Sequence, residues 1–287
     1  MPKSSMKTIK RRIKSVSSTL QITKAMEMVA SSKLRRAKRR AEKLRPYSKA
    51  TESLLSDIAA TKPDFSTPFT KKREVKNRLF IVVAGDRELA GGFNSTILRL
   101  VMSYDKEHET PPKVIAIGKR TADFFKKKNR EILAEYPHFS ENVKVSSCAD
   151  IADYAISLFK SGEVDEVRIF YTAYISALNL EPTQIQLLPL TPPKTGESAP
   201  ADLQVTYDPS PEAVFDRIIP KLFMSVVNCA CVESFASEQS ARRNAMESAS
   251  DNASDMIDKL SLLYNRARQE KITNEINEIV GGANAIS

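Results

Sequence analysis

The residues best placed to do chemistry lie in the segment 85–94, which reads GDRELAGGFN. The segment follows an apolar run and precedes a helical pattern, which is where phosphate-binding loops occur. However, no Lys-Ser or Lys-Thr pair follows the second glycine, and the glycine spacing of dinucleotide-binding loops is also absent. Without that lysine, nothing in the loop would neutralise a β- or γ-phosphate. We therefore interpret the segment as a tight turn from a strand to a helix.

The other reactive side chains do not form a catalytic or metal-binding pattern. His108 and His138 are the only histidines, and no spacing of Cys, His and carboxylate residues matches a metal site. Cys229 and Cys231 are two residues apart on a predicted helix, so they point about 200° apart around its axis. With Cys148 they make three cysteines, which give no disulfide framework. The sequence therefore predicts no active site, no cofactor and no metal.

Positive charge is concentrated at the start of the chain. The net charge is +9 over 287 residues, but residues 1–50 hold sixteen basic and two acidic side chains and carry +14. The remaining residues carry −5. A basic arm of this kind indicates nucleic acid, an anionic membrane or an acidic protein as the partner, and composition alone does not choose among the three.

Composition predicts a soluble, folded protein. Hydrophobic residues make up 41% of the chain and charged residues 28%. We find no run of about 18 apolar residues, so we expect no membrane span. The N-terminus is basic but no apolar segment follows it, so we expect neither a secretory signal nor a mitochondrial transit peptide.

The two ends of the chain have the pattern of long helices. Residues 1–84 and 197–280 contain no glycine, which permits long helices because glycine destabilises helix interiors. In the first segment a seam of apolar and small residues, interrupted by Glu27, recurs at alternating intervals of four and three. Its members are Ile9, Ile13, Val16, Leu20, Thr23, Ala30, Leu34, Ala37, Ala41 and Leu44.

The second segment opens with Ser210-Pro211-Glu212, which is typical of a helix N-terminus. The same spacing then predicts a seam in two stretches: Phe215, Ile219, Leu222, Val226 and Cys229, followed by Ala253, Met256, Leu260, Leu263 and Ala267. We expect this helix to end before Gly281-Gly282. Pro46 and Pro220 should kink their helices or end a segment.

Helices of this length must project from a compact body. At 1.5 Å per residue a helix over 3–58 spans about 80 Å and one over 210–280 about 105 Å. Two such helices can bury their seams against each other only as an antiparallel pair, and the longer one would overhang at its C-terminal end. The overhang would expose Ile272, Ile276 and Ile279, so we expect another protein to provide a socket for it.

The pattern in the middle of the chain predicts an α/β domain. Short apolar runs predict strands at 79–84, 113–117 and 164–172, and the alternation in 183–189 predicts an antiparallel edge strand. Helices are expected at 93–107, 119–128 and 148–160. The fold class is thus α+β overall: a long antiparallel coiled coil of the N- and C-terminal helices plus a central α/β, Rossmann-like domain. The expected parts are an N-terminal helix over 1–60, a linker over 61–78, the central domain over 79–190, a Pro-rich loop over 191–209 and a C-terminal helix over 210–287.

Three motifs resemble the γ subunits of F-type ATP synthases, in their bacterial form. They are IKRRIKSVSSTLQITKAMEMVASSKLRRA, AGDRELAGGFN and ESFASEQSARRNAMESASDNASDMIDKLSLLYNRARQEKITNEINEIVGGA. The resemblance implies a central rotor shaft that couples ion-driven rotation of a membrane c ring to conformational cycling of the catalytic β subunits, for ATP synthesis or hydrolysis. It implies a non-catalytic subunit, because ATP is made or split in the β/α sites.

The resemblance also implies roles for individual residues. Met26, with Lys24 and Glu27, matches the position that faces the acidic lever segment of β. Further coupling positions match Arg242, Arg268, Gln269 and Thr273. The tip, with Ile279, Val280 and Ile286, would sit in an apolar collar of the α/β ring. Tyr207 and Asp208 match the foot, which contacts the c ring and the ε subunit.

The implied partners are three α and three β subunits, the ε subunit and the c ring, with one copy of this chain per complex. The implied location is the cytoplasmic face of the bacterial plasma membrane. One departure is Glu88, where glycine is common in the family. If that position needs a positive φ, Glu88 costs about 1 kcal/mol or more; otherwise it adds only a surface charge.

Two other readings of the residues remain at this stage. The first is a basic coiled-coil protein that binds nucleic acid, but the basic arm contains only one aromatic residue, Tyr47. The second is a nucleotide-dependent α/β enzyme that uses the loop at Gly85, which the missing lysine disfavours.

Overall fold

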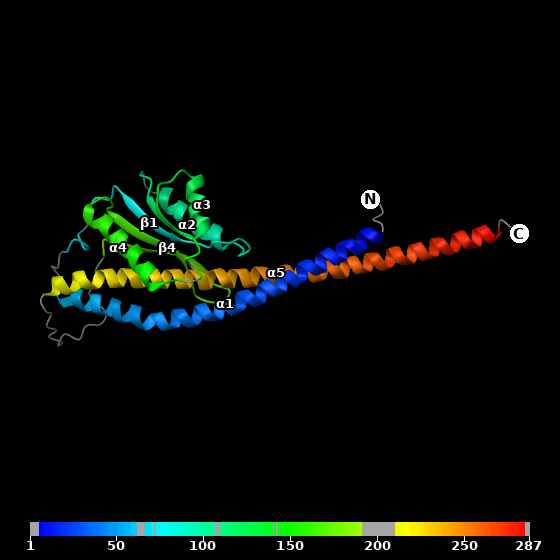
Figure 1. The fold of residues 1–287 in the computed structure, drawn as a ribbon, viewed down its shortest axis with the longest axis horizontal. Helices are drawn as coiled ribbons and strands as arrows, with labels where there is room; N and C mark the ends of the chain where they lie inside the picture. Colours follow the sequence, from blue (N-terminus) through cyan, green and yellow to red (C-terminus); the bar gives the residue numbers. More distant parts are fainter. Residues whose placement is uncertain are drawn as a thin grey trace. The chain divides into compact units, whose positions relative to one another are not determined.

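The apolar runs in the middle of the chain form one five-stranded sheet (Figure 1). In the computed structural model, which describes residues 6–61, 67–71, 73–106, 110–139, 141, 143–190 and 210–284, the strand order is β3-β2-β1-β4-β5. The first four strands in this order are parallel, and β5 runs antiparallel to β4. Their bounds are Arg78–Val83 for β1, Lys113–Ile117 for β2, Ile132–Tyr136 for β3, Glu166–Tyr174 for β4 and Leu180–Leu188 for β5.

Helices cover both faces of the sheet, which explains why β1 is apolar at almost every position. Phe80 and Val82 pack toward α2 (Phe93–Lys106) and α3 (Lys119–Lys127) on one face. The alternate residues of β1 pack toward α4 (Val145–Ser161) and part of α5 on the other face. A parallel sheet buried on both sides needs this continuous hydrophobicity.

Two helices are far longer than the sheet. Helix α1 runs from Met6 to Thr61 and helix α5 from Pro211 to Asn284, which are 56 and 74 residues. Neither Pro46 nor Pro220 ends its helix. The expected stop before Gly281-Gly282 is wrong, because α5 includes both glycines. Each glycine costs about 1 kcal/mol relative to alanine in a helix, which weakens the last turn without forbidding it.

The chain divides into two compact units, and each long helix contributes to both. We call Ser31–Ala241 the body, and Met1–Ala30 with Arg242–Ser287 the paired-helix unit. In the body, α5 presents Phe215, Ile219, Phe223 and Val227 to the core on the α4 side of the sheet. The two sequence ranges assigned to the terminal helices therefore each span two units of the structure.

The fold class and all four strands expected from the sequence are confirmed. Strands occur in the four expected places, and the last one is the antiparallel edge strand. The strand Ile132–Tyr136 was missed: it lies at the other edge of the sheet and is only half-buried, so its sequence ILAEY has neither a continuous apolar run nor clear alternation. Helix α4 begins at Val145, three residues before its expected start.

One feature of α5 bears on the expectation that the chain has no membrane span. Helix α5 contains an 18-residue window with mean hydropathy 1.4, which by length and composition alone is enough for a membrane span. Half of that window is buried inside the protein. Because core helices pass the same test, and α5 packs against the sheet in the body, its hydropathy is that of a core helix.

A buried cation fixes the start of β1. Arg78 is 1% exposed and lies 3.7 Å from the carboxylate of Asp105, which also pairs with Arg130 at 2.5 Å. The Arg78 guanidinium also donates to the carbonyl of Thr110. Removing Asp105 would leave a buried charge unpaired, which is among the most destabilising changes a protein core can undergo.

Gly118 is the glycine whose replacement should be most damaging. Its φ is +95°, and a Cβ at this position would lie 2.2 Å from the carbonyl oxygen of Ala84. Gly162 has a similar φ of +81° but no atom within 4 Å of its Cβ position. We expect Gly162→Ala to cost about 1 kcal/mol of unfolding free energy from backbone strain alone. Gly118→Ala should cost distinctly more, and urea unfolding curves that show equal losses would contradict the steric argument.

The thiol of Cys148 should make stability depend on alkaline pH. Burial raises the pKa of Cys148 to about 12 in the folded protein. An unfolded cysteine has a pKa of about 8.5, so stability is fully present below about pH 8.5 and is lost as the pH rises toward the folded value. Between pH 8 and pH 10 we expect a loss of about 2 kcal/mol that Cys148→Ala removes. A pH dependence identical in both proteins would refute the assignment; Cys231, whose pKa burial also raises, contributes equally to both.

Candidate coupling surfaces on the terminal helices

In the paired-helix unit, the two helices pack through small and polar side chains. Among the described residues of this unit, the buried ones are Ile9, Thr23 and Ala30 on α1 and Arg242, Met246, Ser250 and Ala253 on α5. The Ser250 hydroxyl donates to Thr23 Oγ1 at 2.7 Å, and the Thr23 hydroxyl donates to the carbonyl of Leu20 at 3.1 Å. Side chains this small let the two backbones approach closely, and the hydrogen bond fixes their register.

The register defines where the pairing stops. Met6 is seventeen residues before Thr23, so in an antiparallel pair it lies opposite Ala267, seventeen residues after Ser250. Burial agrees with this position, because Ala267 is the last half-buried residue that the structure describes on α5. The end of α5 therefore extends beyond the start of α1 (Figure 1).

The predicted seam is confirmed on α1 and partly wrong on α5. Every seam residue on α1 is buried or half-buried. On α5, however, Met256 and Leu263 are exposed, and their neighbours Ile257 and Tyr264 occupy the seam instead. Both positions belong to pairs of consecutive apolar residues, so residue type alone could not decide which member faced α1.

The predicted coupling residues on α1 lie on a surface that is more apolar than expected. Lys24 is exposed, whereas Met26 and Glu27 are half-buried. Three large apolar side chains around them are exposed: Ile22 (61%), Met28 (66%) and Val29 (56%). Met28 could be interpreted from the sequence as core or as an adaptable contact, whereas Ile22 and Val29 were not predicted as contacts. Their signal in the sequence is that they are apolar yet lie outside the seam. We refer to these six residues as the α1 contact surface.

The predicted coupling residues on α5 lie in two different environments. Arg242 is buried, whereas Arg268, Gln269 and Thr273 are exposed. Gln269 and Thr273 are four residues apart and therefore lie on one face of the helix. The Thr273 hydroxyl donates to the backbone carbonyl of Gln269 at 3.0 Å. The structure does not bring this group together with the α1 contact surface. Met26 lies opposite Glu247 in the register, so about 33 Å of helix separates it from Gln269.

The end of α5 is apolar and uncovered. Every residue from Arg268 to Asn277 is exposed, and Ile272, Ile276 and Ile279 are 47%, 54% and 72% exposed. The remaining predicted tip and foot residues cannot be placed in the same way. The side chain of Val280, together with Ile286, Tyr207 and Asp208, lies outside the described residues.

In the body, the hydrogen-bonding groups of the loop at Gly85 connect the segments at the carboxyl ends of the strands. The Gly85 N–H donates to Asn94 Oδ1 at 2.8 Å. Asp86 Oδ1 accepts the N–H of Lys119 at 2.9 Å and that of His138 at 2.8 Å. One carboxylate thus joins the segments that follow β1, β2 and β3. The Gly85 amide, which a phosphate could otherwise use, already has a partner within the chain, which supports the structural interpretation of this loop.

Helix α5 fills the crevice where α/β proteins of this topology bind ligands. The strand order places the switch point between β1 and β4, at their carboxyl ends. Ser237 donates to the carbonyl of Thr172 at 3.1 Å, and Ser240 donates to that of Ala177 at 2.9 Å. A Cβ added at Gly85 would lie 3.1 Å from the Glu238 carboxyl carbon. The chain therefore occupies its own crevice.

Glu88 does not have a positive φ, so the first of the two alternatives given for it, a strained backbone, is wrong. The non-glycine residue with a positive φ in this loop is Leu89, at 66°. Glu88 is exposed and forms an ion pair with Arg120 of α3. The second alternative, a surface charge, is therefore correct.

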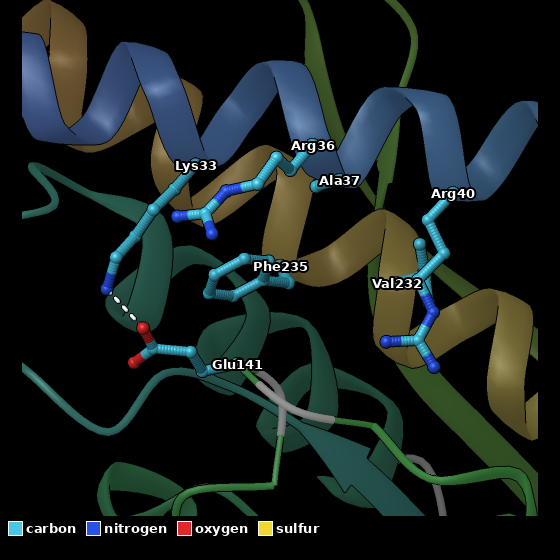
Figure 2. A pocket seen from close by; sticks show the side chains of 7 residues that line it. All are labelled: Lys33, Arg36, Ala37, Arg40, Glu141, Val232 and Phe235. Atoms are coloured by element: carbon cyan, nitrogen blue, oxygen red, sulfur yellow. Dashed lines mark hydrogen bonds and ion pairs between the residues drawn. The ribbon is translucent and has the colours of Figure 1, made fainter.

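A small basic pocket lies in the body between α1 and α5. It has a volume of about 140 Å³ and is lined by Lys33, Arg36 and Arg40 on one side and by Phe235 and Glu141 on others (Figure 2). Lys33 donates to Glu141 and Arg40 to the carbonyl of Val143, so two of the three cations hold the segment before α4 against α1. The hydrogen bond from Lys33 lowers the pKa of Glu141. Among the described residues, no group of three side chains could hold a metal ion.

Comparisons with known proteins agree with this geometry. A family described as ATP synthase matches residues 5–286. The ATP synthase gamma chain of Ruminococcus albus is 46% identical over 278 residues, which are 96% of each chain. That of Alkaliphilus metalliredigens is 45% identical over 285 residues, which are 98% of each chain. The chain therefore belongs to the ATP synthase gamma chains. As a gamma chain it is a stalk subunit of the complex without catalytic residues, and the nucleic-acid interpretation is set aside.

Solved structures of low sequence identity share the fold. A chain in the central stalk and c ring of the Tetrahymena thermophila mitochondrial ATP synthase has a TM-score of 0.61 at 24% identity, covering 80% of this chain and 99% of that one. A chain in the rotor of the Euglena gracilis mitochondrial enzyme has a TM-score of 0.64 at 17% identity, covering 93% and 98%.

Removing the uncovered end of α5 should not affect the stability of the rest of the chain. Deletion of residues 269–287 removes only exposed side chains among those described, so we expect the free energy of unfolding to change by less than about 0.5 kcal/mol. A deletion that begins at Ser250 is the matched control, because it also removes the partner of Thr23 and half the seam. Circular dichroism melts check both, and a destabilised body in the shorter deletion would show that the overhang packs on the chain itself.

Proposed function

We propose that this chain is the central rotor shaft that couples ion-driven rotation of a membrane c ring to conformational cycling of the catalytic β subunits. The observation that carries the proposal is the uncovered apolar end of α5 beyond the start of α1. A single helix with three exposed isoleucines is stable only when a second protein surrounds it. A ring of three α and three β subunits around one copy of this chain provides that surrounding.

The shaft makes contact at two levels. The α1 contact surface meets the acidic lever segment of β, and the group formed by Arg268, Gln269 and Thr273 meets a second β loop higher in the ring. The distance of about 33 Å between Met26 and Gln269 supports this arrangement, because two separated contacts keep an axle from tilting under lateral force. One contact alone would act as a pivot.

Charge supports the choice of β as the partner of α1. The first fifty residues carry +14, and Lys24 is exposed within the α1 contact surface. Solvated ion pairs are individually weak, at about 0–1 kcal/mol each. Such contacts guide the rotor without trapping it in one orientation, which a turning part requires.

The rest of the assembly follows from the same proposal. Tyr207 and Asp208 contact the c ring and the ε subunit at the foot. Arg242 contributes to coupling through packing, because it is buried in this chain. Ile279, Val280 and Ile286 rest in the apolar collar of the ring. The complex stands on the cytoplasmic face of the bacterial plasma membrane.

The test is Met26→Lys in the assembled enzyme. Met26 is half-buried, so a lysine there adds a desolvated charge next to Lys24 and faces β with a polar group where an apolar contact existed. We expect ATP made per ion moved in reconstituted vesicles to fall several-fold, while the α, β and c subunits still co-purify. The control is Val75→Lys, an apolar-to-lysine change at an exposed position of the body.

Two results would count against the proposal. An unchanged yield of ATP per ion in the Met26 variant, with correct assembly, would remove Met26 from the coupling contact. Failure of this chain to co-purify with the α and β subunits would remove the shaft function altogether.

A further inference from the structure

An open groove of about 660 Å³ runs between α2 and α3 on the face of the sheet opposite α4. One stripe of each helix lines it. On α2 these residues include Ser95, Leu98, Arg99 and Met102, and on α3 they include Arg120, Phe124 and Lys127. The loop residues Glu88 to Gly91 close one end. The groove is separate from the coupling surfaces and from the basic pocket of Figure 2.

The floor of the groove is apolar. Leu98 and Ala90 are buried, and Met102 and Phe124 are half-buried, so their apolar surface is partly open to solvent. Leu89 is 59% exposed at the end of the groove, although its backbone has the uncommon φ of 66°. A turn normally places glycine or asparagine at such a φ. A leucine there exposes a large apolar side chain at a cost in backbone strain.

The rim of the groove is basic. The lining includes five cations, Arg99, Lys106, Arg120, Lys127 and Lys128, and two acids, Glu88 and Asp123. Glu88 pairs with Arg120, which leaves four cations around one acid. Among the described residues, none of these four forms an ion pair.

The loop that closes the groove is held in a fixed shape. Asn94 accepts the Gly85 N–H at 2.8 Å and donates to the Arg87 carbonyl at 3.2 Å. Asp86 ties the same loop to the segments after β2 and β3. The GDRELAGGFN segment therefore forms a rigid end wall, and a partner that binds there loses little freedom to loop ordering.

We propose that this groove binds an amphipathic helix of another subunit, with an acidic flank on each side of an apolar stripe. Charge complementarity carries the choice. Four rim cations without an ion pair among the described residues match carboxylates, and the floor between them matches leucine-sized side chains. Two parallel helix stripes form the kind of trough into which a third helix packs. Adaptable Met102 on the floor suits a helical partner.

Nucleic acid and lipid fit the groove less well. A nucleic acid would meet the cations with phosphates but would leave Leu89, Met102 and Phe124 without apolar partners, and the lining offers only one aromatic ring for base stacking. An anionic lipid would match the charge and the apolar floor, but Arg99 lies seven residues, about 10 Å along α2, from Lys106, so a single headgroup would leave one of these cations without a partner.

The experiment is site-specific photocrosslinking in the assembled enzyme. Phe124 is replaced by benzoylphenylalanine, a similar ring that reacts with neighbouring C–H bonds on illumination. The control position is Tyr154 on α4, which is 36% exposed on the opposite face of the sheet. We expect a crosslink from position 124 to one helical segment of another subunit that carries acidic residues, and none to that segment from position 154.

Charge removal then tests the basis of recognition. Lys127→Gln with Arg99→Gln should reduce the yield of this crosslink several-fold. The matched control is Lys126→Gln, because Lys126 is the neighbour of Lys127 but pairs with Glu135 at 2.7 Å and does not line the groove. The control should leave the yield unchanged.

The inference rests on the proposed function only in that the partner is sought in the assembled complex. Co-purification with the α and β subunits without any crosslink from position 124 overturns the groove proposal and leaves the shaft function intact. A crosslink to lipid, to nucleic acid or to a segment without acidic residues also overturns it, as does a yield that charge removal does not change.

Discussion

The architecture depends on one requirement: two helices of 56 and 74 residues must find something to pack against along their length. A helix in water gains most of its stability from burying one face, so an uncovered stretch is weak. In the body, α5 meets this requirement on the sheet. In the paired-helix unit, α1 is the packing partner that the structure describes, and small residues such as Thr23 and Ser250 allow the close approach. Beyond Ala267 the chain offers nothing described to pack on, so the partner must come from elsewhere.

The same requirement explains why a Rossmann-like body has no nucleotide site at its switch point. Helix α5 lies across the carboxyl ends of β1 and β4, where a ligand would otherwise bind, and anchors there through Ser237 and Ser240. Apolar contacts such as those of Phe215 resist separation but tolerate rotation of a helix about its axis. Hydrogen bonds to strand carbonyls are directional and resist that rotation. The combination holds α5 against twisting relative to the sheet, which is what a mount for a shaft has to do.

Much of this fold could be predicted because burial on both faces leaves a strong pattern. The continuous run in β1 allows one assignment. Along the basic helix α1, charged and polar residues exclude most alternatives to the seam, except in the stretch with Ile22, Met28 and Val29. Prediction failed where the pattern allows two assignments. β3 is half-buried at an edge, and the pairs Met256–Ile257 and Leu263–Tyr264 offer two candidates for one seam position. The buried Arg78 could not be predicted either, since its partner Asp105 is 27 residues away in the sequence and only the fold brings them together.

The sequence named only part of the candidate surfaces and none of their geometry, because the register of the two helices fixes the geometry. The large apolar residues at the exposed end of α5 lie on one side of the helix. Ile272, Ile276 and Ile279 are spaced by four and three, so they lie within about 60° of one another around the helix axis. An axle with an apolar stripe on one side is asymmetric. Inside a ring of three equivalent catalytic subunits, such a stripe meets one subunit at a time, so rotation presents it to each in turn. Under the proposed function, this mismatch between a one-sided shaft and a three-fold ring is what turns continuous rotation into a sequence of distinct states.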